Sequence, residues 1–262
     1  MSAVSRITNR SAIARLLDDQ PVENADLLGY LDPGYAEACT WWGRTLNGAL
    51  DTLVLVYDGL SRPGLFTAGN AGGVRPILRD AGRSLPQRVT GHYRPSHREP
   101  VLTAFRDLGR TKHMTRMVLQ RENAALQDDG RAVRLTHADT AQIMRLYGHW
   151  PDHFFEPFQL ESGLYFGIRA EGELVCIAGI HNLSKTYDVA TIGNLVTHPE
   201  HRGRGYASSC TERLVRETFA HVSRVTLDVE AGNEPAMRTF GRLGFREQAA
   251  FFEGELALLP QG

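Results

Sequence analysis

The sequence predicts a mixed α/β (α+β) fold in two parts, and three observations support this. Apolar residues make up 42% of the 262 residues, which is enough to build a sizeable core. Runs with strand-like alternation and runs with helical periodicity follow one another along the chain. The polar stretch QRENAALQDDGRA, residues 120–132, interrupts them and indicates a seam. We therefore expect an N-terminal α/β lobe at residues 1–122 and a second domain at residues 131–262.

The composition argues against several classes of partner. The net charge is −1 and the isoelectric point is near 6.8, so neither nucleic acid nor an acidic membrane surface is expected to bind. The cysteines, Cys39, Cys176 and Cys210, are few and dispersed, which favours reduced thiols over a disulfide framework. The first 20 residues contain no apolar segment of a signal peptide, and no run reaches the ~20 apolar residues of a membrane span. We expect a soluble, cytoplasmic protein.

The first half alternates between strand-like and helix-like segments. Its expected elements are strands at residues 51–59 and 86–93 and helices at residues 73–82 and 96–108. The pair Ser96 and Glu99 has the spacing of a capping box, which predicts a helix start. The glycine-rich segment GNAGGVRPIL, Gly69–Leu78, enters a helix and is a candidate for a second anion site, although it lacks a matching downstream segment.

The second half is easier to interpret. Its expected elements are strands at 132–136, 163–170, 173–183, 188–199, 224–230 and 249–259, and helices at 137–150, 206–221 and 233–244. Short links make the strands from 163 to 199 an antiparallel meander. The strand at 224–230 is reached through a helix, so it is expected to be parallel to its predecessor. Its strict alternation predicts one buried face, formed by Val225, Leu227 and Val229.

The segment THPEHRGRGYASSC, Thr197–Cys210, joins a strand to a helix and carries Arg202, Gly203, Arg204 and Gly205. A helix N-terminus has backbone N–H groups without partners and a partial positive charge. Glycines let phosphate oxygens approach these groups, and the arginines add charge. The segment is therefore a candidate phosphate-binding turn, with a plain strand-to-helix turn as the alternative.

Other phosphate-binding loops fit the turn poorly. A Walker loop requires a lysine after its last glycine, and none follows here. A dinucleotide fingerprint would use Gly203, Gly205 and Ser208, with Asp228 as the ribose-binding acid. The preceding strands are antiparallel, however, and five residues separate strand and glycines, so a nucleotide oxidoreductase is disfavoured. A metal site at His198 and His201 is not expected either, because two imidazoles without a further ligand are weak evidence for metal binding.

Two motifs in this half resemble those of the GNAT superfamily, the acetyl-CoA-dependent N-acyltransferases. The family's phosphate turn, [QR]-x-x-G-x-[GA], is matched by Arg202, Gly205 and Ala207. Its last helix, N-x-x-A-x-x-x-Y-x-x-x-G-F, is matched by Asn233, Ala236, Gly244 and Phe245. The resemblance covers roughly residues 132–258, and both motifs stand in the family's order.

The resemblance implies a GNAT fold, with a mixed, mainly antiparallel sheet flanked by helices, and an N-acetyltransferase that uses acetyl-CoA. The acceptor would be a primary amine of a small molecule or peptide, and the protein a monomer or homodimer. The implied cofactor-binding residues are Leu195, Val196, Thr197, Arg202, Gly203, Arg204, Gly205, Tyr206, Ala207, Ser208, Asn233, Ala236 and Phe240. The first lobe is consistent with a degenerate GNAT-like repeat in a tandem arrangement.

The sequence departs from the family at two catalytic positions. Phe240 stands where many members have a tyrosine that protonates the leaving thiolate, and a phenyl ring cannot donate a proton. Thr191 aligns with the glutamate that serves some members as a base. The candidate bases elsewhere are Glu161, His181 and Glu230. These departures keep open a non-catalytic acyl-CoA-binding sensor or regulatory protein.

Overall fold

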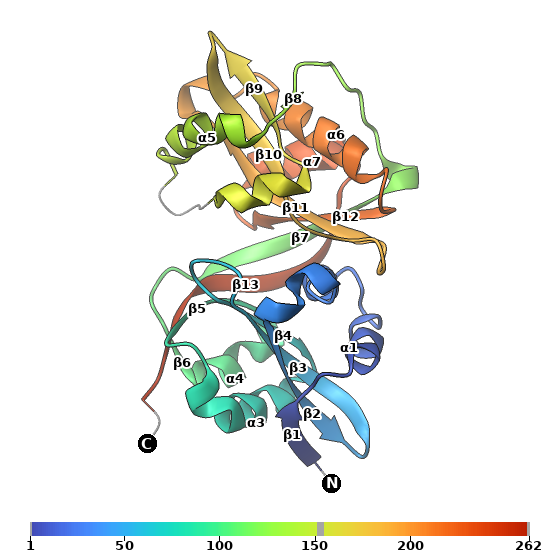
Figure 1. The fold of residues 1–262 in the computed structure, drawn as a ribbon, viewed down its shortest axis with the longest axis vertical. Coiled ribbons are helices and arrows are strands. Elements are labelled where there is room, and N and C mark those ends of the chain that lie inside the picture. The colour runs from blue at the N-terminus through green and yellow to red at the C-terminus, as the bar shows by residue number, and fades with distance from the viewer. Residues whose placement is uncertain (1, 151–154, 261–262) are drawn as a thin grey trace. The chain divides into compact units, whose positions relative to one another are not determined.

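The structure is a computed structural model that describes residues 2–150 and 155–260. Its chain divides into two compact units, which are described separately here (Figure 1). The first unit contains residues 2–116, 230–232 and 248–260, and the second contains the described parts of 117–229 and 233–247. The sequence places both boundaries differently and assigns the C-terminal residues to the second domain. The observed units differ from the expected domains because one long strand, β13 (Arg246–Leu258), begins in the second unit and ends in the first.

The first unit is a sheet covered by helices. Its elements are β1 (Ser2–Arg6), α1 (Arg10–Leu17), α2 (Ala25–Gly29), η1 (Pro33–Ala38), β2 (Cys39–Leu46), β3 (Ala49–Tyr57), β4 (Gly64–Gly69), α3 (Ala71–Ala81), η2 (Gly82–Ser84), β5 (Arg88–Tyr93), η3 (Pro95–His97), α4 (Arg98–Leu102), β6 (Phe105–Asp107) and the start of β7 (Lys112–Gln120). The strand order is β1-β2-β3-β4-β5-β13, and β6 also pairs with β13. The pairs β1–β2, β2–β3, β3–β4, β5–β13 and β6–β13 are antiparallel, whereas β4 and β5 are parallel.

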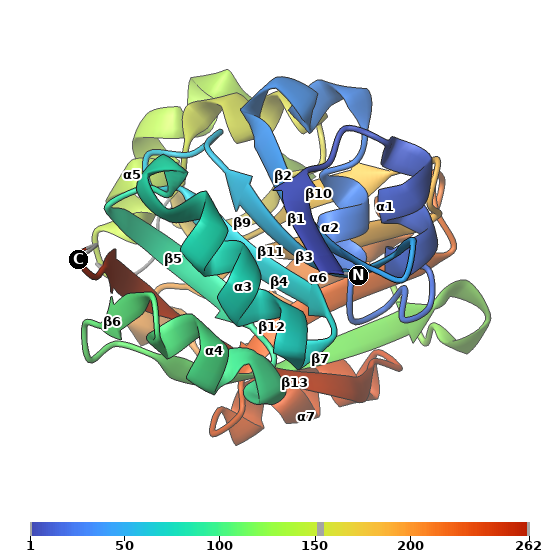
Figure 2. The same cartoon turned by 90° about the horizontal axis from the view of Figure 1, so that it is seen from below.

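Helix α3 supplies much of the core of this unit. It buries Val74, Ile77, Leu78 and Ala81, which recur at helical spacing on one face. This face packs against β3, and Figure 2 shows α3 lying across the strands. Burial of such an apolar stripe stabilises a short helix more than its intrinsic propensity does.

The prediction of a helix at residues 96–108 is wrong in extent, and the predicted capping box does not form. Helix α4 ends at Leu102, and the chain then forms β6, in which the buried Phe105 pairs with Leu258. The open edge of β13 offers hydrogen bonds that local propensity does not anticipate. Ser96 lies inside the turn η3 that Pro95 begins, so it makes no cap.

The second unit contains the predicted meander. Its elements are the end of β7, η4 (Arg121–Asn123), β8 (Val133–Arg134), η5 (His137–Asp139), α5 (Thr140–Tyr147), η6 (Pro157–Ser162), β9 (Phe166–Ala170), β10 (Glu173–Ser184), β11 (Val189–Thr197), η7 (Pro199–His201), α6 (Tyr206–Thr218), β12 (Arg224–Glu230), α7 (Glu234–Arg242) and the start of β13. The strand order is β12-β11-β10-β9-β8, antiparallel except for β11 and β12. The antiparallel meander and the parallel strand after it are confirmed. No helix among the described residues is long and apolar enough to cross a membrane.

One prediction for β12 is wrong in part. Val225, Leu227 and Val229 are buried as expected, but Thr226 on the opposite face is also fully buried. Its hydroxyl lies 3.1 Å from the hydroxyl of Thr191 on β11. Both faces of β12 are therefore covered here, and alternation revealed only the apolar one.

The two units repeat one order of elements. In each, three antiparallel strands lead to a helix, then to a strand parallel to the third, and then to a short helix. The first unit uses β2, β3, β4, α3, β5 and α4, and the second uses β9, β10, β11, α6, β12 and α7. The shared order supports the degenerate-repeat interpretation of the first lobe.

In the first unit, the connection between β4 and α3 leaves no open turn for a phosphate group. A single residue, Asn70, separates β4 from α3, and its side chain accepts a hydrogen bond from the N–H of Gly72 at 2.8 Å. The buried His97 fills the space beside it, with Nδ1 2.8 Å from the hydroxyl of Thr67 and Nε2 3.1 Å from the carbonyl of Gly69. The carbonyl can only accept, so Nε2 donates to it and Nδ1 accepts from Thr67. GNAGGVRPIL is thus capped internally and is not assigned as an anion site.

The burial of His97 predicts a pH dependence of stability. Burial lowers the pKa of His97 from 6.5 to about 4, so the folded protein keeps the ring neutral where the unfolded chain protonates it. The contribution of His97 to the free energy of unfolding is therefore fully present above pH ~6.5. As the pH falls towards 4, this contribution decreases by up to ~1.4 kcal/mol per pH unit. In urea unfolding between pH 7.5 and 5, His97→Gln should show a shallower decline than the wild type. Parallel curves would contradict a neutral, buried His97.

Candidate cofactor and acceptor site

The site begins where β11 and β12 part. Their parallel register runs from Val189 opposite Arg224 to Ile192 opposite Leu227, and no later pair joins them among the described residues. Beyond this point β11 still pairs with β10, with Val196 opposite Ile177. The edge of β11 that faces away from β10 therefore has no strand partner among the described residues along Leu195, Val196 and Thr197. A linear amide-containing ligand can bind such an edge as an added strand does.

A bulge shapes β11 at the point of separation. Asn194 has a left-handed backbone (φ 53°), which asparagine tolerates better than most residues. Its side-chain amide donates to the hydroxyl of Tyr165 at 2.6 Å and approaches Oε1 of Gln159 at 3.4 Å. The buried Tyr165 in turn donates to the carbonyl of Ile180 at 3.3 Å. These contacts fix the direction of the strand just before Leu195. No local motif links these residues, so their contacts could not be predicted from the sequence.

The predicted phosphate turn is open. Gly203 and Gly205 have φ values of 73° and 78°, and α6 begins at the next residue, Tyr206. Apart from its chain neighbours, no described heavy atom lies within 4 Å of the position that a Cβ at Gly203 would take. No hydrogen bond within the described residues uses the backbone N–H groups from Gly203 to Ser208. Exposed N–H groups, a helix dipole and glycine backbones together fit an anionic group such as a diphosphate.

The arginines of the turn contact its flanks. The guanidinium of Arg202 lies 4.6 Å from the centroid of the Trp150 ring. Nη1 of Arg204 lies 3.4 Å from Nδ1 of His201, and Nη2 donates to the carbonyl of Glu200 at 3.3 Å. Both side chains are exposed, so they add positive potential to the turn.

Helix α6 begins with small residues, which let it lie close to the turn. Ala207 and Ser208 are half-buried, and Ser209 is buried. Below them lie two buried cysteines, Cys176 of β10 and Cys210 of α6, neither in a disulfide. A hydrogen bond with Cys176 and burial raise the pKa of the Cys210 thiol. Cys210 is therefore a neutral thiol, and its sulfur packs in the core.

The motif residues of α7 serve first as structure. Asn233 caps the helix, because its side chain accepts a hydrogen bond from the N–H of Ala236 at 3.2 Å. Phe240 is 6% exposed and packs edge-on against Phe245, with 6.1 Å between ring centroids. Gly244 ends this segment with φ 102°.

The three candidate bases lie in different surroundings. Glu161 is exposed on η6. Glu230 belongs to the first unit, where its carboxylate lies 3.6 Å from Nζ of Lys112. His181 is the bulged residue of β10, and its ring covers Gly193, so that a Cβ there would lie 2.3 Å from Nε2. His181 therefore lies against the residue that follows the last paired position of β11, Ile192.

Thr191, at the family's glutamate position, does not face a cleft. It is 1% exposed and pairs with Thr226, whose hydroxyl also lies 3.3 Å from the carbonyl of Ala190. The site has no room for a carboxylate at this position.

The histidines beside the turn form an aromatic cluster. The rings of His149 and His198 lie 4.3 Å apart in an edge-on arrangement, and His198 and His201 lie 5.4 Å apart. They border a pocket formed by α5, the β9–β10 hairpin and η7. In the described part of the chain, no group of three or more His, Cys, Asp or Glu residues is placed to hold a metal ion.

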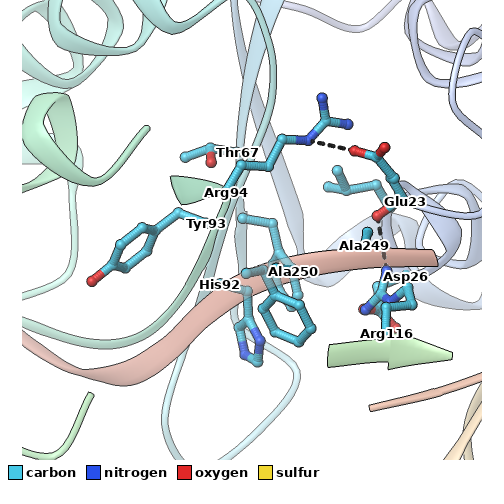
Figure 3. A pocket seen from close by; sticks show the side chains of 12 residues that line it. Glu23, Asp26, Thr67, His92, Tyr93, Arg94, Arg116, Ala249 and Ala250 are labelled. Carbon is cyan, nitrogen blue, oxygen red and sulfur yellow. Dashed lines mark hydrogen bonds and ion pairs between the residues drawn. The ribbon is translucent and has the colours of Figure 1, made fainter. Parts of the chain in front are cut away.

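A second pocket lies in the first unit, near the end of the β4–β5 pairing (Figure 3). Its guanidinium groups already have anionic partners. Nε of Arg94 lies 3.4 Å from Glu23, and Arg116 pairs with Asp26. Since these charges neutralise each other, the pocket is not assigned to the cofactor.

The polar stretch predicted as a seam contributes to the site. Residues 124–131, called the strap below, lie along α6. The N–H of Gln127 donates to Glu212 at 2.8 Å, and Asp128 accepts from Arg213 at 2.9 Å. Ser209 of the first turn donates to Asp129. Composition alone gave no signal for this role.

Comparisons with known proteins agree with this architecture. A family model described as "Acetyltransferase (GNAT) family" matches residues 113–245, just over half of the chain. No curated protein matches the chain significantly in sequence.

Solved structures share the fold at low identity. A Drosophila protein is 15% identical with a TM-score of 0.71, and the match covers all of both chains. A GCN5-related N-acetyltransferase from Kribbella flavida is 16% identical with a TM-score of 0.61, over 92% of this chain and 95% of that one. A tandem GNAT protein from the clavulanic acid biosynthesis pathway is 14% identical with a TM-score of 0.57, over all of both chains. The chain belongs to the GNAT family of acetyltransferases, which confirms the resemblance stated from its motifs.

Proposed function

We propose that the protein transfers an acetyl group from acetyl-CoA directly to a primary amine of a small molecule or peptide. One observation carries the proposal: the unpaired edge of β11 is followed, after the short turn η7, by an open helix N-terminus at α6 without a side-chain cap. An extended chain that ends in a diphosphate fits this combination, because the strand edge can bind its amides and the helix mouth its charge.

Each part of the site has its own task. Acetyl-CoA would supply an activated thioester for attack by the amine. The backbone N–H groups from Gly203 to Ser208 would hold the diphosphate, and those near Val196 would polarise the acyl carbonyl. Fixing both reactants lowers the entropic part of the barrier.

The proton inventory differs from that of many family members. Phe240 supplies no proton to the leaving thiolate. A thiol with a pKa of ~8.5 is a fair leaving group near neutral pH without assistance. Of the candidate bases, His181 has the most favourable position, beside Gly193 at the end of the strand pairing.

His181→Gln tests this role. If His181 accepts the amine proton, kcat should fall by about tenfold, the worth of one hydrogen bond to a charged group, because water can replace an exposed base in part. The affinity for acetyl-CoA should stay unchanged in calorimetry. A loss of that affinity would instead place the ring in the cofactor site. His137→Gln, the same substitution at an exposed position of the same unit, serves as the matched control.

The activity itself is tested by thiol release. Acetyl-CoA is offered with a panel of amines, including aminoglycosides, amino acids and peptides with a free terminus, and the freed thiol is measured. Release that depends on one class of amine supports the proposal and names the acceptor. Tight acetyl-CoA binding without release on any amine would favour a sensor.

A further inference from the structure

The strap places a third arginine at the mouth of α6, besides Arg202 and Arg204. Nη1 of Arg131 donates to the carbonyl of Arg204 at 3.4 Å, and its guanidinium lies 5.3 Å from the centroid of the Tyr206 ring. Nη2 lies 3.6 Å from the position of a Cβ at Gly205. Apart from chain neighbours, it is the only described heavy atom within 4 Å of that position. Arg131 therefore borders the same opening as the free N–H groups.

Asp129 holds this guanidinium in place. Nε of Arg131 donates to Oδ2 of Asp129 at 2.8 Å, and Nη2 lies 2.7 Å from the same oxygen. Ser209 donates to Oδ1, which anchors the pair to the first turn of α6. The contact with Arg131 lowers the pKa of Asp129 to about 2, so the carboxylate stays charged at neutral pH. The charge that attracts the guanidinium is thus present throughout the neutral pH range.

Arg131 keeps donors for a ligand. A guanidinium has five N–H groups. The contacts to Asp129 and to the carbonyl of Arg204 use three of them, which leaves one on each terminal nitrogen. The side chain is 42% exposed, so these groups reach solvent. Arginine is well suited to phosphate oxygens because its donors are planar and delocalised.

The turn's own arginines are placed less favourably. Arg202 stacks on Trp150, and Arg204 contacts His201 and the carbonyl of Glu200. Both therefore contact η7 or Trp150, whereas Arg131 comes from the strap and lies next to Gly205. An anion at the mouth would lie between the N–H groups and Arg131.

We propose that Arg131, held by Asp129 and Ser209, is a cofactor-binding residue that donates to a diphosphate oxygen of coenzyme A at the mouth of α6. The inference rests on the proposed function and adds a residue that neither family motif contains. The strap is then part of the binding site, and the alternative is that Arg131 only packs against Tyr206.

Calorimetry with CoA and with dephospho-CoA, which keeps the diphosphate but lacks the 3′-phosphate, tests the proposal. Arg131→Ala should raise the Kd of both ligands by about 10- to 100-fold, the value of a charge-assisted hydrogen bond. The affinity of Arg131→Ala for these ligands should also depend less on salt concentration than the affinity of the wild type does. Arg169→Ala, which removes the ion pair with Asp139 elsewhere in the same unit, is the control and should leave both Kd values unchanged.

The outcomes separate the two proposals. If the wild type binds both ligands and Arg131→Ala binds them equally well, the inference is overturned and the proposed function stands. A loss confined to CoA would also overturn it, because the arginine would then contact the 3′-phosphate. If the wild type binds neither ligand, the proposed function itself fails. If Arg131→Ala melts at a temperature close to that of Arg169→Ala, its loss of ligand affinity is not due to unfolding.

Discussion

Gly205→Glu is expected to weaken acetyl-CoA binding by at least ~100-fold, equivalent to about 2.7 kcal/mol. Gly205 has a left-handed backbone at the entrance of α6, and an L-residue there costs ~1–2 kcal/mol of strain. The new carboxylate would stand beside the N–H groups proposed to hold the diphosphate and would repel it. It would also reach Arg131, whose Nη2 lies 3.6 Å from the new Cβ, and the resulting ion pair would cover the mouth.

The measurement is calorimetric titration with acetyl-CoA, with two further variants for comparison. Gly172→Glu introduces the same charge and the same strain (φ 85°) in the β9–β10 hairpin of the same unit, where nothing lies within 4 Å of a Cβ. It should bind acetyl-CoA like the wild type. Gly205→Asn keeps the left-handed backbone without the charge and should lose less affinity than Gly205→Glu. Wild-type affinity in Gly205→Glu would show that the cofactor does not use this turn.

The turn could be predicted because its parts are neighbours in the sequence. Gly203, Gly205 and the small residues after them stand between a recognisable strand and a recognisable helix, so local rules suffice. The antiparallel meander was predictable for the same reason, since Glu171 and Gly172 form a tight hairpin with positive φ values.

The parts that were missed depend on contacts between distant segments. The strap has the composition of a linker, and only its side-chain pairs with α6 show that it is ordered. Tyr165 and Asn194 are 29 residues apart, and nothing local marks them as partners. In the first unit, β6 forms because an open edge of β13 receives it, although the residues before it favour a helix.

The position of the proton acceptor could not be predicted for a different reason. The family pattern points to Thr191, and sequence alone cannot tell whether that residue faces a cleft or the core. The structure places it in the paired part of β11 and β12, against Thr226. We therefore expect the proton acceptor to lie past the end of this pairing, where His181 covers Gly193.

Thr191→Glu should therefore lower the free energy of unfolding by ~3–5 kcal/mol at pH 7 and should not speed turnover. The residue is 1% exposed, so the variant buries a carboxylate without a cationic partner beside Thr226. Burial raises the pKa of such a group in the folded state above its unfolded value. The deficit should thus shrink as the pH falls from 7 to 5, because the folded protein can then keep the group protonated.

Urea unfolding at both pH values measures this, with Thr191→Val as the control. The valine removes one hydroxyl but adds no charge, so it should cost only ~1–2 kcal/mol, equally at both pH values. A Thr191→Glu variant that is as stable as wild type and turns over faster would show that the position opens to the acceptor. In that case the closed threonine pair would not explain the missing glutamate, and His181 would lose its claim as the base. A large, pH-dependent deficit would instead show that this position is closed to a carboxylate in the folded protein.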